Sequence, residues 1–333
     1  MDDAVLAREA LAQISAAVAG RTRPVALELR LPEPNTDFGR RLEAVANQVV
    51  DAAGDGAELS VVRSQSGEGG PALVLRSHGY GEIHYRALPV GPELPPFVAA
   101  LGAAARPGGG LPVAPVDGLV ALDVFISPEC PNCPRSVRAA VELAAGNQQA
   151  VVRVIDVTAL PDLAAAVGVR SVPTIVSGDG LTLVGAIDFP DLVKKIESVR
   201  GGDGDGVVFL SLVDAGRFAE AAKLLSSQNG RRAFIKRWGS SSLEGRIGLA
   251  LTADEALAGS ADTLDEMVAE LLPLLASEIA PLRGDTADLL GRIGHPGARQ
   301  ALEGLLDDDD EDVAEVAADS LGDLRVEDPG DRP

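Results

Sequence analysis

In residues 1–200 the apolar pattern predicts the same order of strands and helices twice, and this order limits the fold more than any other feature of the chain. An opening amphipathic helix is predicted at residues 3–18. The first pass then has strands at 25–31, 57–62, 71–76 and 82–86 and helices at 38–53 and 95–105. The second pass has strands at 119–126, 150–157, 173–177 and 181–186 and helices at 130–145, 161–167 and 189–199. Strands alternating with helices predict an α/β fold in each pass, and the repeated order indicates an internal duplication.

Two glycine-rich stretches divide the chain. Residues 106–117 are rich in Gly and Pro without an apolar period, and residues 201–206 read Gly-Gly-Asp-Gly-Asp-Gly, so both are predicted linkers. Beyond them every apolar period is helical. Segments 274–293 and 305–324 superimpose along their whole length at one constant offset. Because helix pairs of this length cannot bury their apolar faces alone, we expect an α-solenoid at 207–326, followed by a frayed tail at 327–333.

The net charge of the chain and its first ten residues indicate which partners it can bind and in which compartment we expect it. The 333 residues carry a formal net charge of -21, which repels nucleic acid and anionic membranes. The first ten residues contain acids where a secretory signal has Lys or Arg, and no apolar run approaches the roughly 18 residues of a membrane span. We therefore expect a cytoplasmic protein that binds neither nucleic acid nor membrane.

The only two cysteines, Cys130 and Cys133, follow the strand at 119–126 and open the next predicted helix. The positive end of a helix stabilises an anion, and dithiol motifs so placed have thiol pKa values of roughly 3.5 to 7.5 instead of about 8.5. Pro131 suits a first helical position. We therefore predict that Cys130 is a nucleophile and that Cys133, one turn further, is the resolving thiol. Arg135 and Arg138 would lower the pKa of the thiol and Glu129 would raise it.

Three other roles for the cysteine pair are open. A structural disulfide is disfavoured by the compartment and by the close spacing at a helix start. Half of a tetrahedral zinc site would need two further ligands, and the chain offers only His78, His84 and His295, the first two in a predicted hairpin. The cysteines could also have no function. We favour redox chemistry and expect neither a metal nor a cofactor.

Asp123 lies within the apolar strand, seven residues before Cys130. Strand alternation could bring its carboxylate under the start of the helix, near Cys133. A carboxylate buried there would have a raised pKa and could accept the proton of the resolving thiol. The alternative is that Asp123 faces solvent.

A strand, Cys130-Pro131-Asn132-Cys133 at a helix start, and Ser171-Val172-Pro173-Thr174 before a hairpin together resemble the thioredoxin fold. Two such folds in tandem, with cysteines in the second alone, resemble the N-terminal domain of the alkyl hydroperoxide reductase flavoprotein subunit. The resemblance implies that Pro173 is cis and faces the cysteines. It also implies that the Val172 backbone pairs with an extended substrate segment, beside Pro131 and Asn132.

The resemblance has two departures. No flavin or nicotinamide domain follows, and no G-x-G-x-x-G follows a strand, so the electrons must come from another protein, an external thiol or a flavoprotein reductase. Residues 32–37 lie where the first fold would have its cysteines. This fold is therefore expected to have no redox activity and to serve as a packing or docking partner. The tail from about 287 to 324 is similar to HEAT repeats.

The predicted fold class is α/β, two tandem thioredoxin-like folds followed by an all-α HEAT-like domain. The first fold spans 1–105 and the second 118–200. We expect a thiol–disulfide oxidoreductase in cell redox homeostasis that exchanges dithiols with client protein disulfides, with a relay to a peroxiredoxin-like partner and protein docking on the helical domain. The alternative is a non-catalytic scaffold, built on the inert fold and the helical repeats, that binds a partner. Direct reduction of peroxide is disfavoured, because the sequence shows no pocket for a small oxidant.

Overall fold

The computed structural model describes residues 5–20, 24–64, 70–77, 79–106, 118–260 and 262–324. It divides the chain into two compact units, Met1–Glu197 and Ser198–Pro333. The predicted linker at 106–117 lies outside the described residues except for Arg106, and the predicted tail at 327–333 lies wholly outside them. None of the helices in the described part of the chain is both long and apolar enough to cross a membrane.

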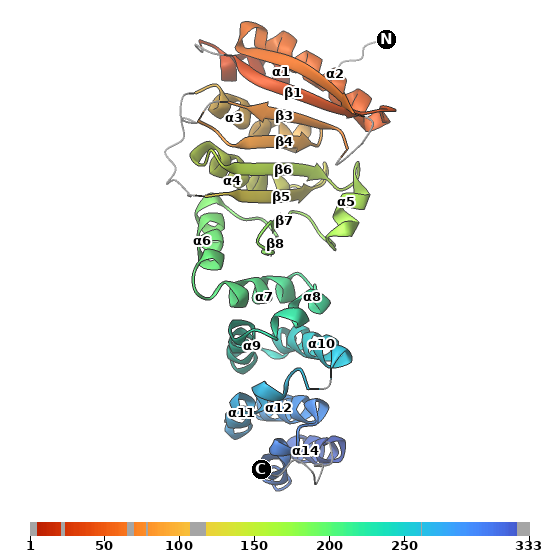
Figure 1. Cartoon of the computed structure of the whole chain (residues 1–333), viewed down its shortest axis with the longest axis vertical. Coiled ribbons are helices and arrows are strands. Elements are labelled where there is room, and N and C mark those ends of the chain that lie inside the picture. Colours follow the sequence, from red (N-terminus) through yellow and green to blue (C-terminus); the bar gives the residue numbers. More distant parts are fainter. Residues whose placement is uncertain are drawn as a thin grey trace. The chain divides into compact units, whose positions relative to one another are not determined.

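The first unit is built on one eight-stranded sheet with the order β2-β1-β3-β4-β6-β5-β7-β8 (Figure 1). Its strands are β1 (Val25–Pro32), β2 (Ala57–Ser64), β3 (Ala72–Arg76), β4 (Glu82–Arg86), β5 (Val120–Ile126), β6 (Ala150–Asp156), β7 (Thr174–Ser177) and β8 (Thr182–Val184). They agree with the strands expected from the apolar pattern. Each half contributes four neighbouring strands, so the predicted duplication is visible in the strand order.

Helices cover the two faces of this sheet unequally. They are α1 (Arg8–Val18), α2 (Asp37–Ala53), α3 (Leu94–Ala104), α4 (Cys133–Gly146), α5 (Pro161–Ala166) and α6 (Phe189–Arg200), with short 3-10 turns η1 (Gly54–Gly56) and η2 (Gly91–Glu93). Alternate strand residues such as Leu27, Tyr85 and Val124 share one buried cluster with α1, α2, α3, α4 and α6. Among the described helices, α5 alone packs on the opposite face, against Phe125 and Ile155.

The two halves join through β4 and β6, which pair in parallel from Glu82 opposite Val151 to Arg86 opposite Ile155. The two halves also come into close contact just before β4, where the Gly81 N–H of the first half donates to the carbonyl of Ala144 of the second at 2.8 Å. A Cβ atom on Gly81 would lie 2.6 Å from the carbonyl oxygen of Ala150. The two predicted folds are therefore halves of one sheet with one shared core, which the sequence did not indicate.

The second unit contains helices and no strand among its described residues. Its elements are α7 (Gly204–Asp214), α8 (Phe218–Leu224), α9 (Gln228–Ser240), α10 (Leu243–Gly259), η4 (Asp265–Met267), α11 (Val268–Leu271), η5 (Leu272–Ala276), α12 (Ala280–Ile293), η6 (Pro296–Ala298), α13 (Arg299–Glu303) and α14 (Glu311–Asp323). Trp238 stacks on Phe234 at 5.5 Å between ring centroids and donates its Nε1–H to the hydroxyl of Thr286 at 3.0 Å. Helix α7 begins inside the predicted linker at 201–206, because Gly206 packs closely against Asn229 and Ala233.

The predicted repeat in this unit corresponds to two packed helices, α12 and α14, whose first residues Ala280 and Glu311 are equivalent in the repeat. Equivalent positions of the repeat are buried in both helices. They are Leu282 with Val313, Thr286 with Ala317, and Leu289 with Ser320. Asp310 caps α14 by accepting hydrogen bonds from Asp312 N and Val313 N. The HEAT-like assignment and the docking role of this unit stay predictions.

The close approach at Gly81 predicts that Gly81→Ala destabilises the first unit by about 1–3 kcal/mol, because the added methyl group displaces β4 from β6. Thermal unfolding followed by circular dichroism measures this. Trp238 is the only tryptophan and lies in the second unit, so its fluorescence identifies the transition of that unit.

The control is Gly178→Ala, whose new Cβ would make an ordinary contact at 3.6 Å with Ala121. Equal melting of the two variants would contradict the importance of this contact.

Candidate active site

The two cysteines lie between β5 and α4. After β5 ends at Ile126 the chain turns, and the Cys130 N–H donates to the carbonyl of Ser127 at 3.0 Å. A disulfide joins Cys130 to Cys133, with 5.5 Å between their Cα atoms. The side chain of Cys130 is largely buried, with 8% exposure, whereas Cys133 is fully buried. This asymmetry matches the predicted order, in which an outer sulfur meets the substrate and an inner sulfur resolves.

The helix itself begins at Cys133, three residues later than predicted. Cys130, Pro131 and Asn132 belong to the turn before it, and the proline of the first helical turn is Pro134 instead of Pro131. The prediction for Pro131 was therefore wrong, because the turn after β5 uses residues that the pattern assigned to the helix. Pro131 and Asn132 are both exposed beside Cys130. The sulfur atoms still lie at the positive end of α4, which stabilises a thiolate.

The Val172–Pro173 segment, directly before β7, lies beside Cys130. The Val172–Pro173 peptide bond is cis, which confirms the expectation. The Val172 carbonyl oxygen lies 3.8 Å from Cys130 Sγ. The Pro173 carbonyl accepts from Gly185 N at 2.8 Å, but the Val172 N–H donates no hydrogen bond within the described part of the chain. Val172, whose carbonyl lies beside Cys130, therefore also has a backbone N–H that no described residue engages.

The arginines expected to tune the thiol are engaged by carboxylates. Arg135 pairs with Asp188 at 2.8 Å and Arg138 with Glu142 at 3.2 Å, both on the surface. The hydrogen bond from Arg135 lowers the pKa of the Asp188 carboxyl. Because each guanidinium already has an anionic partner, the helix end is the main feature that favours the thiolate.

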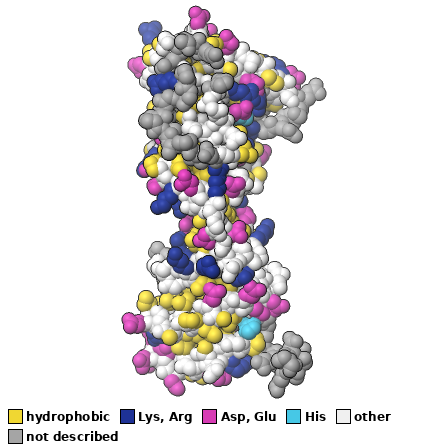
Figure 2. Space-filling model, turned by 60° about the vertical axis from the view of Figure 1, so that its left-hand side comes forward, with side chains coloured by type: hydrophobic (Ala, Val, Ile, Leu, Met, Phe, Trp, Pro, Cys, Tyr) yellow, Lys and Arg dark blue, Asp and Glu magenta, His cyan; other side chains and the backbone are white. Residues whose placement is uncertain are grey.

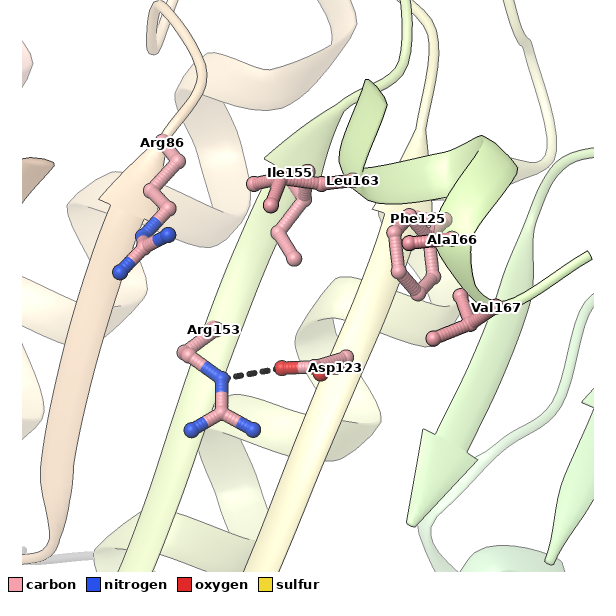
Figure 3. Close-up of a pocket in the computed structure, with 8 residues that line it drawn as sticks. All are labelled: Arg86, Asp123, Phe125, Arg153, Ile155, Leu163, Ala166 and Val167. Atoms are coloured by element: carbon pink, nitrogen blue, oxygen red, sulfur yellow. Dashed lines mark hydrogen bonds and ion pairs between the residues drawn. The ribbon is translucent and has the colours of Figure 1, made fainter. Parts of the chain in front are cut away.

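Asp123 lies on the other face of the sheet (Figure 3). Its strand neighbours Leu122 and Val124 belong to the cluster that contains Cys133, whereas Asp123 lines a cleft under α5 and pairs with Arg153. The prediction that its carboxylate lies under Cys133 was therefore wrong. Side chains alternate along a strand, and a shift of one residue moves a side chain to the opposite face.

A different carboxylate lies on the cysteine side of the sheet. Glu93 ends η2, which packs against α4. Its side chain is buried, and neither carboxylate oxygen has a hydrogen-bond partner within the described residues. Burial, together with the nearby charge of Asp156, raises the pKa of Glu93 to about 7. The sequence signal for this residue was an isolated acid in the apolar, proline-rich stretch 90–97, and we did not single it out.

His84 is the described histidine of the first unit, and it does not lie beside the cysteines. His84 is buried on β4 and contacts Glu82 at 2.9 Å, on the sheet face opposite α4. His78 lies outside the described residues. Within the described ranges, no group of three or more His, Cys, Asp or Glu side chains could hold a metal ion.

Known structures with this architecture include the alkylhydroperoxide reductase AhpF of Enterococcus faecalis. That structure is 18% identical, has a TM-score of 0.50, and is matched over 57% of this chain and 98% of its own. A protein disulfide oxidoreductase from Aeropyrum pernix is 19% identical, with a TM-score of 0.47, over 60% of this chain and 94% of its own. The first likeness shows the fold, a mixed α/β sheet of the tandem thioredoxin type.

Matches to known sequences cover the second half of the first unit. The sequence profile described as "Thioredoxin domain" matches residues 120–198, which include both cysteines and Pro173. A thioredoxin from Methanocaldococcus jannaschii is 37% identical over 79 residues, which are 23% of this chain and 93% of that thioredoxin. Through this part, the chain belongs to the thioredoxin family.

Proposed function

We propose that this protein is a thiol–disulfide oxidoreductase that exchanges dithiols with disulfides of client proteins. Family membership and the close Cys130–Cys133 pair support oxidoreductase chemistry at the general level. The observation that carries the proposal is that the sulfur of Cys130, the more exposed of the two cysteines, lies 3.8 Å from the carbonyl oxygen of Val172, a residue whose N–H has no hydrogen-bond partner among the described residues. This arrangement fits a protein substrate that presents both a disulfide and a strand of backbone.

The exchange balances in two steps. In the reduced protein the Cys130 thiolate attacks one sulfur of the client disulfide, a mixed disulfide forms, and the client's other sulfur leaves as a thiolate. The Cys133 thiolate then attacks Cys130 Sγ, and the second client sulfur leaves. The client gains two electrons and two protons, and the Cys130–Cys133 disulfide forms.

The turn and the cis-proline loop would hold the client during this exchange. An extended client segment can add to the Val172 backbone as a short strand, since the Val172 carbonyl lies beside Cys130 Sγ and the Val172 N–H has no hydrogen-bond partner among the described residues. Pro131 and Asn132, exposed next to Cys130, would contact the same segment. Backbone pairing gives affinity for many sequences, which suits an enzyme with several clients.

Glu93 is the proposed proton acceptor for Cys133. A buried carboxyl whose pKa is about 7 exchanges protons near neutral pH, where thiol exchange must both take up and release them. Glu93 belongs to the first half of the unit, which has no cysteines. In this proposal the first half supplies the proton-accepting carboxylate for the reaction.

Electrons must then return to the pair from outside the chain, and we propose an external thiol or a flavoprotein reductase as the donor. One proposed client class is the disulfide form of a peroxiredoxin-like peroxidase. The helical second unit is the proposed docking module. Figure 2 shows hydrophobic side chains gathered on the lower part of the molecule. Among the described residues of the second unit, the exposed large hydrophobic side chains are Leu243, Ile247, Leu251, Ile279 and Leu306.

Cys130→Ser is expected to abolish catalysed reduction of insulin disulfides by dithiothreitol, because the other thiol, Cys133, is fully buried and cannot reach the client disulfide. Cys133→Ser should keep this attack and accumulate mixed disulfides, seen as adducts in non-reducing gels. Full activity of Cys130→Ser would contradict the proposal and favour the scaffold alternative. That alternative also predicts an ordinary thiol pKa of about 8.5 on titration of thiolate absorbance.

Glu93→Gln is expected to slow the reaction by about 100-fold at pH 8 and to remove the component of the pH profile with a midpoint near 7. Asp123→Asn is the matched control, because Asp123 lies on the opposite face of the sheet and should leave the profile unchanged. An unchanged profile in Glu93→Gln, or equal loss in both variants, would refute the role of Glu93.

The same residue predicts a pH-dependent stability in the disulfide form, where the cysteines do not titrate. The pKa of Glu93 is raised in the folded state from 4.5 to about 7, so the folded protein binds the extra proton between these values. The free energy of unfolding should therefore fall by up to ~3 kcal/mol as pH rises from 4.5 through 7, and Glu93→Gln should remove this fall. Urea unfolding at several pH values measures it, and identical slopes in both proteins would contradict the raised pKa.

A further inference from the structure

A cleft of about 290 Å³ lies on the sheet face opposite the cysteines, where α5 ends and the uncovered part of the sheet begins. Figure 3 shows the side chains that line it, which come from three adjacent strands and from α5. The proposed redox function uses none of them. The cleft therefore needs a separate explanation.

Two guanidinium groups lie on the floor of the cleft, Arg153 from β6 and Arg86 from β4. Arg153 donates its Nε–H to Asp123 on the neighbouring strand. Its terminal nitrogens, Nη1 and Nη2, make no hydrogen bond or ion pair within the described part of the chain. These nitrogens form a planar fork of N–H donors, and this fork matches the two oxygens of a carboxylate.

This sheet face is less negative than the chain as a whole. On the described strands it carries four guanidiniums and four carboxylates: Arg30, Arg76, Arg86, Arg153, Glu28, Glu58, Glu82 and Asp123. They sum to zero, on a chain with a formal net charge of -21. Burial, followed by the charge of Arg153, lowers the pKa of Arg86, which shows that the two guanidiniums lie close enough to act on one anion together.

The remaining walls are apolar. Phe125 and Ile155 lie on the floor next to the arginines, and Leu163, Ala166 and Val167 of the α5 region form one side. A ligand that fills the cleft would therefore place an anionic end on the arginines and an apolar body against α5. Inorganic phosphate or acetate would satisfy the first part alone.

We propose that this cleft binds a small organic carboxylate with an alkyl or aryl body, held by the Nη fork of Arg153 with Arg86 beside it and by the apolar wall at Leu163. The binding is non-covalent and involves no electron transfer. It does not depend on the proposed function, because the cleft and the cysteines lie on opposite faces of the sheet.

Isothermal titration of the full chain with benzoate tests this, with benzamide as a neutral probe of the same shape and acetate as a probe without the ring. We expect benzoate to bind with a Kd of about 1 mM, and the other two at least tenfold more weakly. Arg153→Gln should weaken benzoate about tenfold or more, since a charge-assisted bidentate pair is lost. Arg138→Gln, on the surface of α4, is the matched control and should bind as the parent does.

Leu163→Glu is the second variant, because it leaves Arg153 in place and puts a negative charge on the wall, and it should abolish benzoate binding. Circular dichroism melting of each variant checks that it is folded. The proposal is overturned if benzoate and benzamide bind equally, or if neither binds at a concentration tenfold above the expected Kd of about 1 mM. It is also overturned if the folded Arg153→Gln and Leu163→Glu variants both bind benzoate as the parent does.

Discussion

The parallel pairing of β4 with β6 is the interaction on which the rest of the first unit depends. Each half contributes four strands, and this single seam turns them into one eight-stranded sheet. The seam is close enough that Gly81 has no room for a Cβ atom beside Ala150. Because the sheet is continuous, the helices of both halves pack on one face and share one hydrophobic core.

The shared core brings part of the cysteine-free half against the helix that begins at Cys133. Helix α3 and the turn η2 of the first half pack against α4 of the second, and η2 brings the buried Glu93 to the helix that begins at Cys133. A carboxyl group whose pKa is near 7 can exchange protons at neutral pH, and burial together with the charge of Asp156 raises the pKa of Glu93 to about this value. The duplication therefore places a titratable group that a single fold of this chain would lack.

The two faces of the sheet have different chemistry. One face is covered by α1 to α4 and α6 and contains the buried sulfur of Cys133. The other is covered by α5 over only part of its area, and its remaining strands carry ion pairs such as Arg76 with Glu28 and Arg153 with Asp123. Alternation along each strand keeps the redox site and the arginine cleft apart, although they share the same strands.

The sequence by itself determined the strands and helices and the cysteine pair, because these follow from local periodicity and from motifs of adjacent residues. The resemblance to the thioredoxin fold implied the cis bond before Pro173. The sequence also determined the repeat of α12 and α14, since their buried positions recur at the offset that relates segments 274–293 and 305–324. Only the tertiary structure decided that the two folds form one sheet, that α4 starts at Cys133, that Asp123 faces α5 and that Glu93 faces α4. These features depend on how a turn positions the next strand and on pairing between segments far apart in the chain, and local patterns contain neither the path of the turn nor the partner of the strand.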